Sequence, residues 1–258
     1  MPLISIIIPC YNQGQYLAES IGSVLASDFT DLEIIVVDDG STEPETCQIL
    51  EMLDYPKTRL IRRANGGLAA ARNSGIAQAQ GRYILPLDAD DRIGPAYISQ
   101  AVKALEDNPA LGAVYCLAEK FGGESGPWKL PSFSRWRMGL GNLIFCAAVY
   151  RFDDWNELGG YDESLRRGWE DWDFWLGILE LGRGVHRLLQ VGFYYRKSTG
   201  SMAAGMIAEE KLELHRRMIV EHGRFFGVWG LLLMPLLPIY YRLADSTLYR
   251  AAKKALGH

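Results

Sequence analysis

Two groups of acidic residues follow apolar runs in the N-terminal part of the chain. Asp88-Ala89-Asp90-Asp91 comes directly after the run 83–87, and Asp38-Asp39 comes directly after the run 32–37. Like charges this close repel, and removing a carboxylate from water is costly unless a cation or hydrogen-bond donors compensate. A hard divalent cation such as Mg²⁺ or Mn²⁺ prefers oxygen ligands and keeps positions that substrate phosphates fill. The pattern therefore indicates a site for a cation and a phosphate-bearing substrate.

A structural interpretation of the same residues needs no ligand. Asp side chains that follow a strand often cap the next helix or hold a solvated turn. Further along the chain, Glu170, Asp171 and Asp173 open a segment of helical character, where acids complement the helix dipole. Residue types alone leave both interpretations open.

The elements that would position these groups alternate between apolar strands and helix-like segments as far as residue 118. This alternation is typical of right-handed βαβ units forming a mostly parallel sheet flanked by helices, an α/β fold. The expected strands are residues 3–9, 32–37, 59–62, 82–87 and 113–117, and the expected helices are 16–25, 44–53, 68–78 and 95–106. Ligands of such sheets bind at the carboxyl ends of the strands. The polar residues at or just beyond those ends are Tyr11, Asn12, Asp38, Asp39, Asn65 and 88–91.

The remainder of this region is less regular. Residues 121–137 are rich in Gly, Pro, Ser and Trp and are expected to form a loop over the site. Residues 141–151 resemble another strand, and residues 172–181 a helix that ends at Gly182.

Composition and cysteine spacing argue against a nucleic-acid-binding, disulfide-bonded or secreted protein. The formal net charge of −4 over 258 residues gives no support for nucleic acid as a partner. Cys10, Cys47, Cys116 and Cys146 lack CxxC spacing and are expected to be core thiols in a reducing compartment. No basic region precedes an apolar stretch at the N-terminus, so we expect no secretory signal and a cytoplasmic protein.

Five short strings, in this order, resemble the inverting family 2 glycosyltransferases of the GT-A fold, and the similarity covers roughly residues 3–202. The strings are SIIIPCYN at 5–12, VDDGS at 37–41, NGG at 65–67 with ARN at 71–73, LDADD at 87–91 and GWEDW at 168–172. The resemblance implies a nucleotide-sugar-binding half at 1–118, an acceptor-binding and catalytic-base half at 119–205, and a helical tail at 206–258.

The resemblance also implies a donor, a nucleotide-diphosphate sugar that is UDP- or dTDP-linked. Pro9 and Tyr11 would shape the base pocket, with the aromatic ring packing on a pyrimidine, and Asp39 would hydrogen-bond the base while Asp38 braces the turn at Gly40. Arg72 would reach either phosphate or the acidic cluster. The alternatives are a Tyr11 that covers the core and an Arg72 in a surface salt bridge. The full set of expected donor-binding residues is Pro9, Tyr11, Asn12, Asp39, Asn65, Arg72 and Asp88.

Asp88 and Asp90 match the family's DXD motif. By resemblance, Asp90 would bind Mn²⁺ or Mg²⁺, Asp88 would contact ribose or metal-bound water, and Asp91 would support them. Asp171, in the Glu170-Asp171 pair, would be the general base that takes the proton of the acceptor hydroxyl.

Glu170 and Trp169 would support this base, the tryptophan by excluding water. The implied reaction is transfer of a hexosyl or related sugar to a saccharide or lipid-linked acceptor in cell-surface polysaccharide or glycan synthesis.

One departure from the family pattern bears on the metal. Many relatives carry a His shortly after a Tyr-Arg pair as a further ligand, whereas Tyr195-Arg196 is followed here by Lys197, Ser198 and Thr199. Metal binding would then depend on Asp90 and the donor diphosphate, or Lys197 would supply positive charge. His186 is expected to be a packed or exposed residue. The departure leaves open a nucleotide-sugar-binding module without turnover. A sugar nucleotidyltransferase would need a Gly-rich basic loop after the first strand, which residues 11–14 do not supply.

The tail begins with a charged helix at 208–224, followed by seventeen uncharged residues, 225–241, that contain Pro235 and Pro238. A spanning helix needs about twenty residues, so this segment is expected either to lie in a membrane interface through residues 225–256, at the cytoplasmic face, or to pack on protein, including a second copy in a homodimer.

Overall fold

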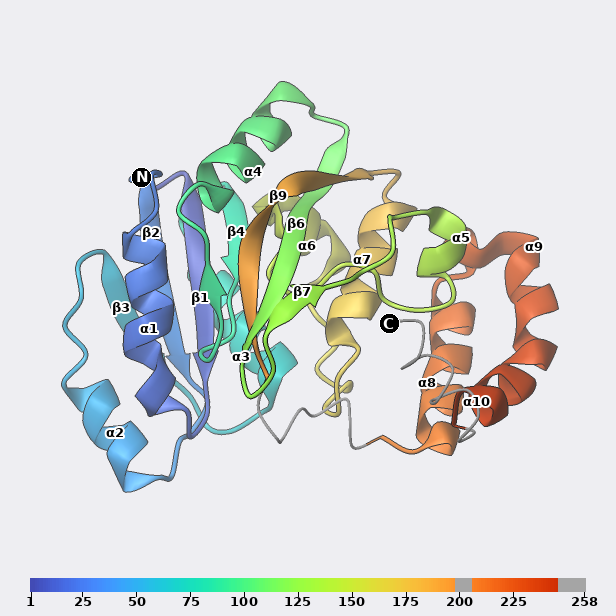
Figure 1. The fold of residues 1–258 in the computed structure, drawn as a ribbon, viewed down its shortest axis with the longest axis horizontal. Coiled ribbons are helices and arrows are strands. Elements are labelled where there is room, and N and C mark those ends of the chain that lie inside the picture. Colours follow the sequence, from blue (N-terminus) through green and yellow to red (C-terminus); the bar gives the residue numbers. More distant parts are fainter. Residues whose placement is uncertain (198–205, 246–258) are drawn as a thin grey trace. The chain divides into compact units, whose positions relative to one another are not determined.

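The computed structural model describes residues 1–197 and 206–245. The chain divides into two compact units, Met1–Thr199 and Gly200–His258. The first unit holds the sheet and every expected site residue, and the second holds the helices of the expected tail (Figure 1).

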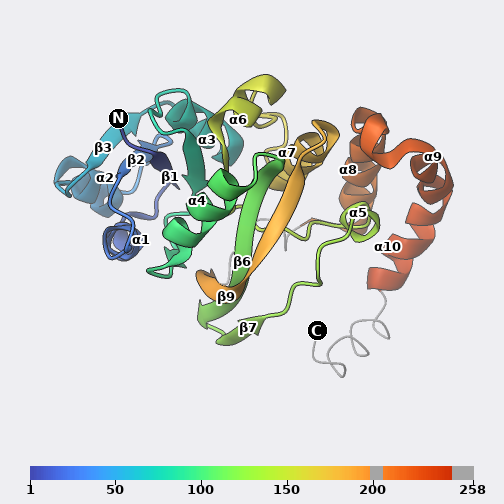
Figure 2. The same ribbon diagram turned by 90° about the horizontal axis from the view of Figure 1, so that it is seen from above.

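The N-terminal part of the sheet is parallel, as the alternating sequence pattern predicts. Its strands are β1 (Ile4–Cys10), β2 (Leu32–Asp38), β3 (Thr58–Arg62) and β4 (Tyr83–Pro86), in the spatial order β3-β2-β1-β4. The connecting helices are α1 (Gly14–Leu25), α2 (Pro44–Glu51) and α3 (Leu68–Ile76). Figure 2 shows α1 and α3 on opposite sides of this part of the sheet. All residues of β1 are buried, because a parallel strand with both faces covered reads as a continuous apolar run.

The other part of the sheet is mixed. The short strand β8 (Val149–Arg151) pairs antiparallel with both β4 and β6 (Leu111–Gly122), and β6 pairs parallel with β9 (Gly184–Lys197). The strands β5 (Arg92–Ile93) and β7 (Gly126–Trp128) extend this part antiparallel to β9 and β6. Its helices are α4 (Tyr97–Asp107), α5 (Arg135–Met138), α6 (Phe152–Leu158) and α7 (Glu170–Glu180). The expected α/β fold with a mostly parallel central sheet is confirmed.

Two local predictions were wrong. Of the strand expected at 141–151, only β8 at its end forms, although residues 143–145 and 147–151 are buried. An apolar run signals burial but not strand pairing, and here most of the run is irregular chain. The loop expected at 121–137 contains β7, which pairs with the unexpectedly long β6, and the short helix α5.

The second unit is a cluster of helices. It contains α8 (Ala208–Glu221), α9 (Gly223–Leu233), a 3₁₀ turn at Met234–Leu236 and α10 (Leu237–Asp245). The expected charged helix thus ends at Glu221, and the apolar segment that follows is helical but interrupted at Gly227, whose φ of 51° lies outside the helical region.

Candidate active site

The carboxyl ends of β1, β2 and β4 meet at one edge of the sheet, as parallel strands require. Tyr11 follows β1 with 47% of its surface exposed, so it does not cover the core, while Pro9 is buried within β1. Asn12 adopts the left-handed conformation with φ of 53°, and its Oδ1 accepts hydrogen bonds from the backbone N–H groups of Thr42 and Glu43 at 2.8 and 3.0 Å. Asn12 therefore joins the end of β1 to the start of α2.

The two acids at the end of β2 accept hydrogen bonds from backbone N–H groups of nearby turns. Asp38 accepts a hydrogen bond from the backbone N–H of Ser41 at 2.8 Å and so braces the turn at Gly40. Asp39 is buried, and its carboxylate accepts from the N–H groups of Gly66 and Gly67 at 3.0 and 2.8 Å.

Arg63 also donates to Asp39 at 2.8 Å, and Asn65 donates its amide to the Asp39 carbonyl at 2.9 Å. Asp39 thus holds the 65–67 turn ahead of α3. Its expected hydrogen bond to a nucleotide base stays a prediction.

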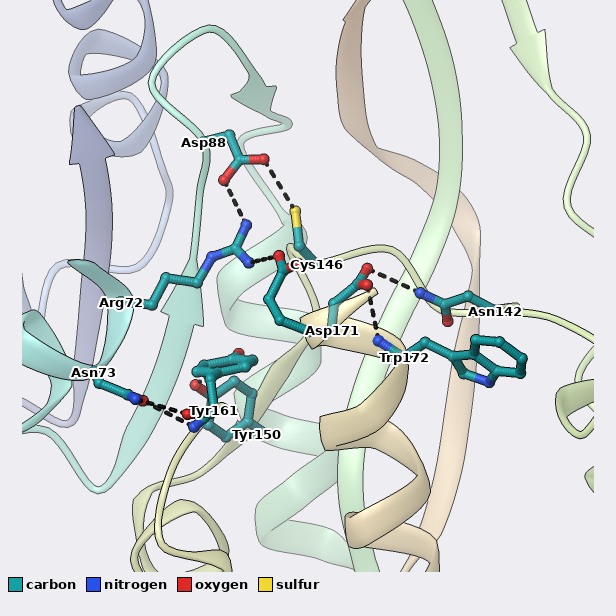
Figure 3. Close-up of polar contacts among 10 residues, drawn as sticks. Arg72, Asn73, Asp88, Asn142, Cys146, Tyr150, Tyr161, Asp171 and Trp172 are labelled. Atoms are coloured by element: carbon teal, nitrogen blue, oxygen red, sulfur yellow. Dashed lines mark hydrogen bonds and ion pairs between the residues drawn. The ribbon is translucent and has the colours of Figure 1, made fainter. Parts of the chain in front are cut away.

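Arg72 lies at the centre of the candidate site. Its guanidinium donates to Asp88 Oδ1 at 2.7 Å and to Glu170 Oε1 at 2.5 Å, and its side chain is 1% exposed (Figure 3). Of the roles considered for Arg72, the structure shows contact with the acidic cluster, not a surface salt bridge. One buried cation therefore links the end of β4 to the start of α7.

Cys146 completes the surroundings of Asp88. Its thiol donates to Asp88 Oδ2 at 3.5 Å, so each oxygen of that carboxylate has a donor. Burial, with the Asp88 charge beside it, raises the pKa of Cys146 well above its ordinary value. The thiol thus stays protonated and able to donate.

The neighbour of Arg72 fixes the loop that leads into α7. Asn73 Nδ2 donates to the Tyr161 carbonyl and Asn73 Oδ1 accepts from the Tyr161 N–H, both at 2.8 Å (Figure 3). At Gly160, where φ is 92°, a Cβ would lie 2.7 Å from Asn73 Oδ1. Helix α3 thus anchors both the loop and the first turn of α7, because Arg72 and Asn73 are adjacent.

Asp171 is held by two donors at the start of α7. The amide of Asn142 donates to Oδ2 at 2.8 Å, and the Trp172 backbone N–H donates to Oδ1 at 2.8 Å (Figure 3). Burial and the neighbouring Glu170 charge raise the pKa of Asp171 to about 7, against an opposing effect of Arg72. A half-buried carboxylate with this pKa is suited to accept a proton near neutral pH.

The residue before this acidic pair is strained. Trp169 has φ of 73°, a conformation that bulky side chains rarely adopt and that clusters at functional sites. Its ring meets that of Trp172 edge to face, with centroids 5.1 Å apart, and Trp172 Nε1 donates to the Met138 carbonyl at 2.9 Å. The half-buried Trp169 thus precedes Asp171 by two residues, and its ring packs on Trp172, whose indole is fixed by the Met138 carbonyl.

The last two acids of the cluster differ sharply. Asp91 is buried and accepts from the Arg196 backbone N–H at 2.7 Å, and burial raises its pKa well above the ordinary value. Asp90 is half-buried, and burial together with the Asp88 charge raises its pKa to about 6. Within residues 1–197 and 206–243, no side-chain cation forms an ion pair with Asp90.

Arg196 supports this loop from β9. Its guanidinium donates to the Asp90 carbonyl at 2.8 Å, pairs with Glu19 and lies 4.3 Å from the Phe121 ring centroid. Lys197, which was expected to supply positive charge in place of the missing His, ends β9. Ser198 and Thr199, which follow it in the sequence, lie outside the described residues. His186 is exposed on β9.

The carboxylates at this edge would suit a cation that is held partly by substrate phosphates. Among the described residues, no group of three or more His, Cys, Asp or Glu side chains is arranged to hold a metal ion. Asp88 already contacts Arg72 and Cys146, whereas Asp90 is a carboxylate of the same loop for which no ion pair is found among the described residues. Mg²⁺ is commonly bound through one or two protein carboxylates plus substrate phosphates. Burial and the Asp88 charge raise the pKa of Asp90 despite the opposing charge of Arg196, so a cation bound there would offset a carboxylate that is costly to ionise.

Sequence reasoning missed the supporting roles of Asn142, Cys146 and Arg196. Asn142 lies in a run expected to be a strand, Cys146 was expected only as a core thiol, and Arg196 was noted only as part of a Tyr-Arg pair. Each contacts a partner at least 29 residues away in the chain. No local pattern signals such contacts.

Comparison with known proteins identifies the family and supports the fold. The family model described as "Glycosyl transferase family 2" matches residues 5–163. The chondroitin synthase of Escherichia coli is 30% identical over 192 residues, which make up 72% of this chain and 28% of that protein. The hyaluronan synthase of Pasteurella multocida is 28% identical over 192 residues, covering 72% of this chain and 20% of that protein.

The chain therefore spans little more than a quarter of these relatives at most. Among solved structures, S. aureus TarS 1-349 in complex with UDP-GlcNAc superposes with a TM-score of 0.72 at 24% identity, covering 86% of this chain and 66% of that one. This likeness supports the fold. Because the family model covers more than half of the sequence, the chain belongs to glycosyl transferase family 2.

Proposed function

We propose that this chain is an inverting glycosyltransferase that moves a sugar from a nucleotide-diphosphate donor to an acceptor hydroxyl. The observation that carries the proposal is Arg72, which joins Asp88 at the donor edge of the sheet to Glu170, directly before the half-buried Asp171. The reaction needs a diphosphate to depart and a hydroxyl proton to be removed. Arg72 links the carboxylates assigned to these two events, because it pairs with Asp88 and with Glu170 next to Asp171.

The donor is a UDP-sugar in this proposal. The exposed ring of Tyr11 at the end of β1 offers a face for a pyrimidine base. The TarS structure with UDP-GlcNAc supports this class of donor, since the folds superpose. A dTDP-sugar presents a similar pyrimidine and is the alternative donor.

Asp171 acts as the general base. The acceptor oxygen attacks the anomeric carbon from the face opposite the diphosphate, the bond to the diphosphate oxygen breaks, and the hydroxyl proton passes to Asp171. Asn142 and the Trp172 N–H hold the carboxylate in place, and a base of this kind contributes about 10² to 10⁴-fold. Trp169, two residues before it in the chain, limits water at the base.

A divalent cation, Mn²⁺ or Mg²⁺, belongs to the proposal as a cofactor. Asp90 would hold it together with the donor diphosphate, while Asp88 contacts the ribose or metal-bound water. When bound, the cation supplies positive charge to the departing diphosphate. Arg72 and Arg196 keep Asp88 and the Asp90 backbone in position.

The acceptor is a saccharide or a lipid-linked saccharide, and the reaction takes place at the cytoplasmic side of a membrane. The E. coli chondroitin synthase and the P. multocida hyaluronan synthase, by their names, support a role in polysaccharide synthesis.

Thermal-shift and hydrolysis measurements test this function. At about one hundred times its Kd, a donor adds about 2.7 kcal/mol of stability, which corresponds to roughly 5–10 °C for a domain of this size. We expect such a shift with one UDP-sugar and Mn²⁺, together with slow release of UDP. A nucleotide sugar that binds without any turnover, even with saccharide acceptors, would identify a binding module. No shift with any UDP- or dTDP-sugar would refute the donor assignment.

A further inference from the structure

The second unit carries apolar side chains on two faces of its last two helices. On the inner face, Phe226 and Gly230 of α9 and Leu237 and Tyr241 of α10 are buried. Leu237 and Tyr241 are spaced i, i+4, as one face of a helix requires, whereas the break at Gly227 separates Phe226 from Gly230. These buried residues pack against α8, which lies against both helices within the unit (Figure 1).

The contacts with α8 are close and specific. Gly230 approaches α8 so tightly that a Cβ there would lie 2.8 Å from Ile219 Cγ2. On α10, the Tyr241 hydroxyl lies 2.9 Å from Nδ1 of the buried His215. The inner face of the pair is therefore a packed interface, and rotating α9 or α10 to bury its other side would break it.

The outer face is apolar as well, and it is exposed. Val228, Leu231, Leu232, Leu236 and Ile239 are 56–74% exposed. By helical spacing, Val228 and Leu232 lie on the side of α9 opposite Gly230, and Ile239 lies on the side of α10 opposite Leu237 and Tyr241. Leu231 is beside Leu232 in α9, and Leu236 ends the 3₁₀ turn between the two helices. We call these five residues the outer face. Trp229 and Tyr240 lie beside them and are also exposed, at 61% and 41%. Large apolar side chains exposed together on one segment in this way mark an interaction site.

Positive charge at both ends of this apolar segment indicates a partner that is negatively charged. Between Glu221 and Asp245, the charged side chains are Arg224 and Arg242, one at each end of the apolar segment and both exposed. The sequence after Asp245 adds Arg250, Lys253 and Lys254 and no acid. Apolar side chains bracketed by cations, with aromatic rings at the side, match the chemistry of an anionic lipid surface.

Helix length decides how the segment would meet the lipid. The described run Gly223–Leu243 is long and apolar enough, by length and composition, to cross a membrane. However, it is broken at Gly227 and again at the 3₁₀ turn around Pro235. Even without the break at Gly227, helices of 11 and 9 residues would extend only about 16 and 14 Å, whereas the hydrocarbon core of a bilayer is about 30 Å thick.

We propose that the outer face binds the surface of an anionic bilayer, with α9 and α10 lying in the plane of the interface and Arg224 and Arg242 meeting lipid phosphates. The inference goes beyond the transfer reaction and does not depend on it. It places the chain on membranes through its second unit.

Co-sedimentation of the full chain with vesicles tests the proposal. We expect binding to vesicles of phosphatidylcholine with phosphatidylglycerol, weaker binding to phosphatidylcholine alone, and weakening by salt. Leu232→Glu should reduce binding by about tenfold or more, and Arg224→Gln by about fivefold. Leu189→Glu, at a residue of β9 that is 77% exposed, is the matched control and should bind as the wild type does. Circular dichroism checks that each variant is folded.

Three results would overturn the proposal. The first is no binding to anionic vesicles. The second is equal loss for Leu232→Glu and Leu189→Glu. The third is a wild-type dimer in size-exclusion chromatography that Leu232→Glu converts to a monomer without any change in vesicle binding, which would assign the outer face to a second copy of the chain.

Discussion

Replacing Arg72 by methionine should destabilise the protein far more than replacing an ordinary surface arginine. Arg72 is 1% exposed, and its partners Glu170 and Asp88 are 5% and 26% exposed. Methionine fills much of the space but leaves Glu170 buried without a cation. Breaking a buried pair in this way costs about 3–5 kcal/mol, a large share of the roughly 5–15 kcal/mol that stabilises a typical domain.

Arg82→Met is the matched control. Arg82 pairs with Glu106 at 3.0 Å, but the two side chains are 58% and 41% exposed. Exposed pairs contribute about 0–1 kcal/mol, so the control should unfold close to the wild type. Urea denaturation followed by circular dichroism gives both free energies of unfolding.

A second measurement separates positioning of the site from mere stability. Arg72 lowers the pKa of Asp171, which burial and Glu170 raise to about 7. Removing the guanidinium should therefore move the pKa of Asp171 upward. If Asp171 is the base, the rise of kcat/KM with pH should shift to higher pH in Arg72→Met and shift less in Arg72→Lys, which keeps the charge.

Two results would refute this reasoning. If Arg72→Met and Arg82→Met unfold with the same free energy, the buried bridge between β4 and α7 does not carry the stability assigned to it. If Arg72→Met is destabilised but its pH profile coincides with that of the wild type, Arg72 does not act on the base.

Three further substitutions test the site. Asp171→Asn should reduce transfer by about 10²-fold or more while the donor Kd stays near normal, and undiminished transfer would remove Asp171 as the base. The same variant should melt at a higher temperature than the wild type at pH 8. The pKa of Asp171 is about 7 in the folded state against an ordinary value of 3.8. Between these two pH values the unfolded state loses the proton first, so the contribution of Asp171 to the free energy of unfolding falls as pH rises. Asp90→Ala should weaken Mn²⁺-dependent donor binding by about tenfold or more in calorimetry, and an unchanged Kd would contradict its role as ligand. Asn142→Ala should shift the pH profile of kcat/KM to higher pH, because it removes a donor to the ionised carboxylate; a lower kcat with no shift would mean that Asn142 only packs.

The sequence by itself determined the α/β fold and the edge at which the acids gather. Asp38 and Asp88 follow apolar runs that become β2 and β4. Parallel strands bring their carboxyl ends to one edge whatever the details of packing, so local pattern was sufficient. The five ordered strings also indicated the family that the family model matches.

Tertiary structure decided what each acid contacts. Arg72 reaches Glu170 across 98 residues of sequence, and Asn142 reaches Asp171 across 29. Residue types did not separate a buried arginine between two carboxylates from an exposed one, because the burial of a charge depends on how distant elements pack. The same limit explains the strand wrongly expected at 141–151. Its apolar residues correctly indicated burial, but which of them pair with β4 and β6 depends on how the whole sheet assembles.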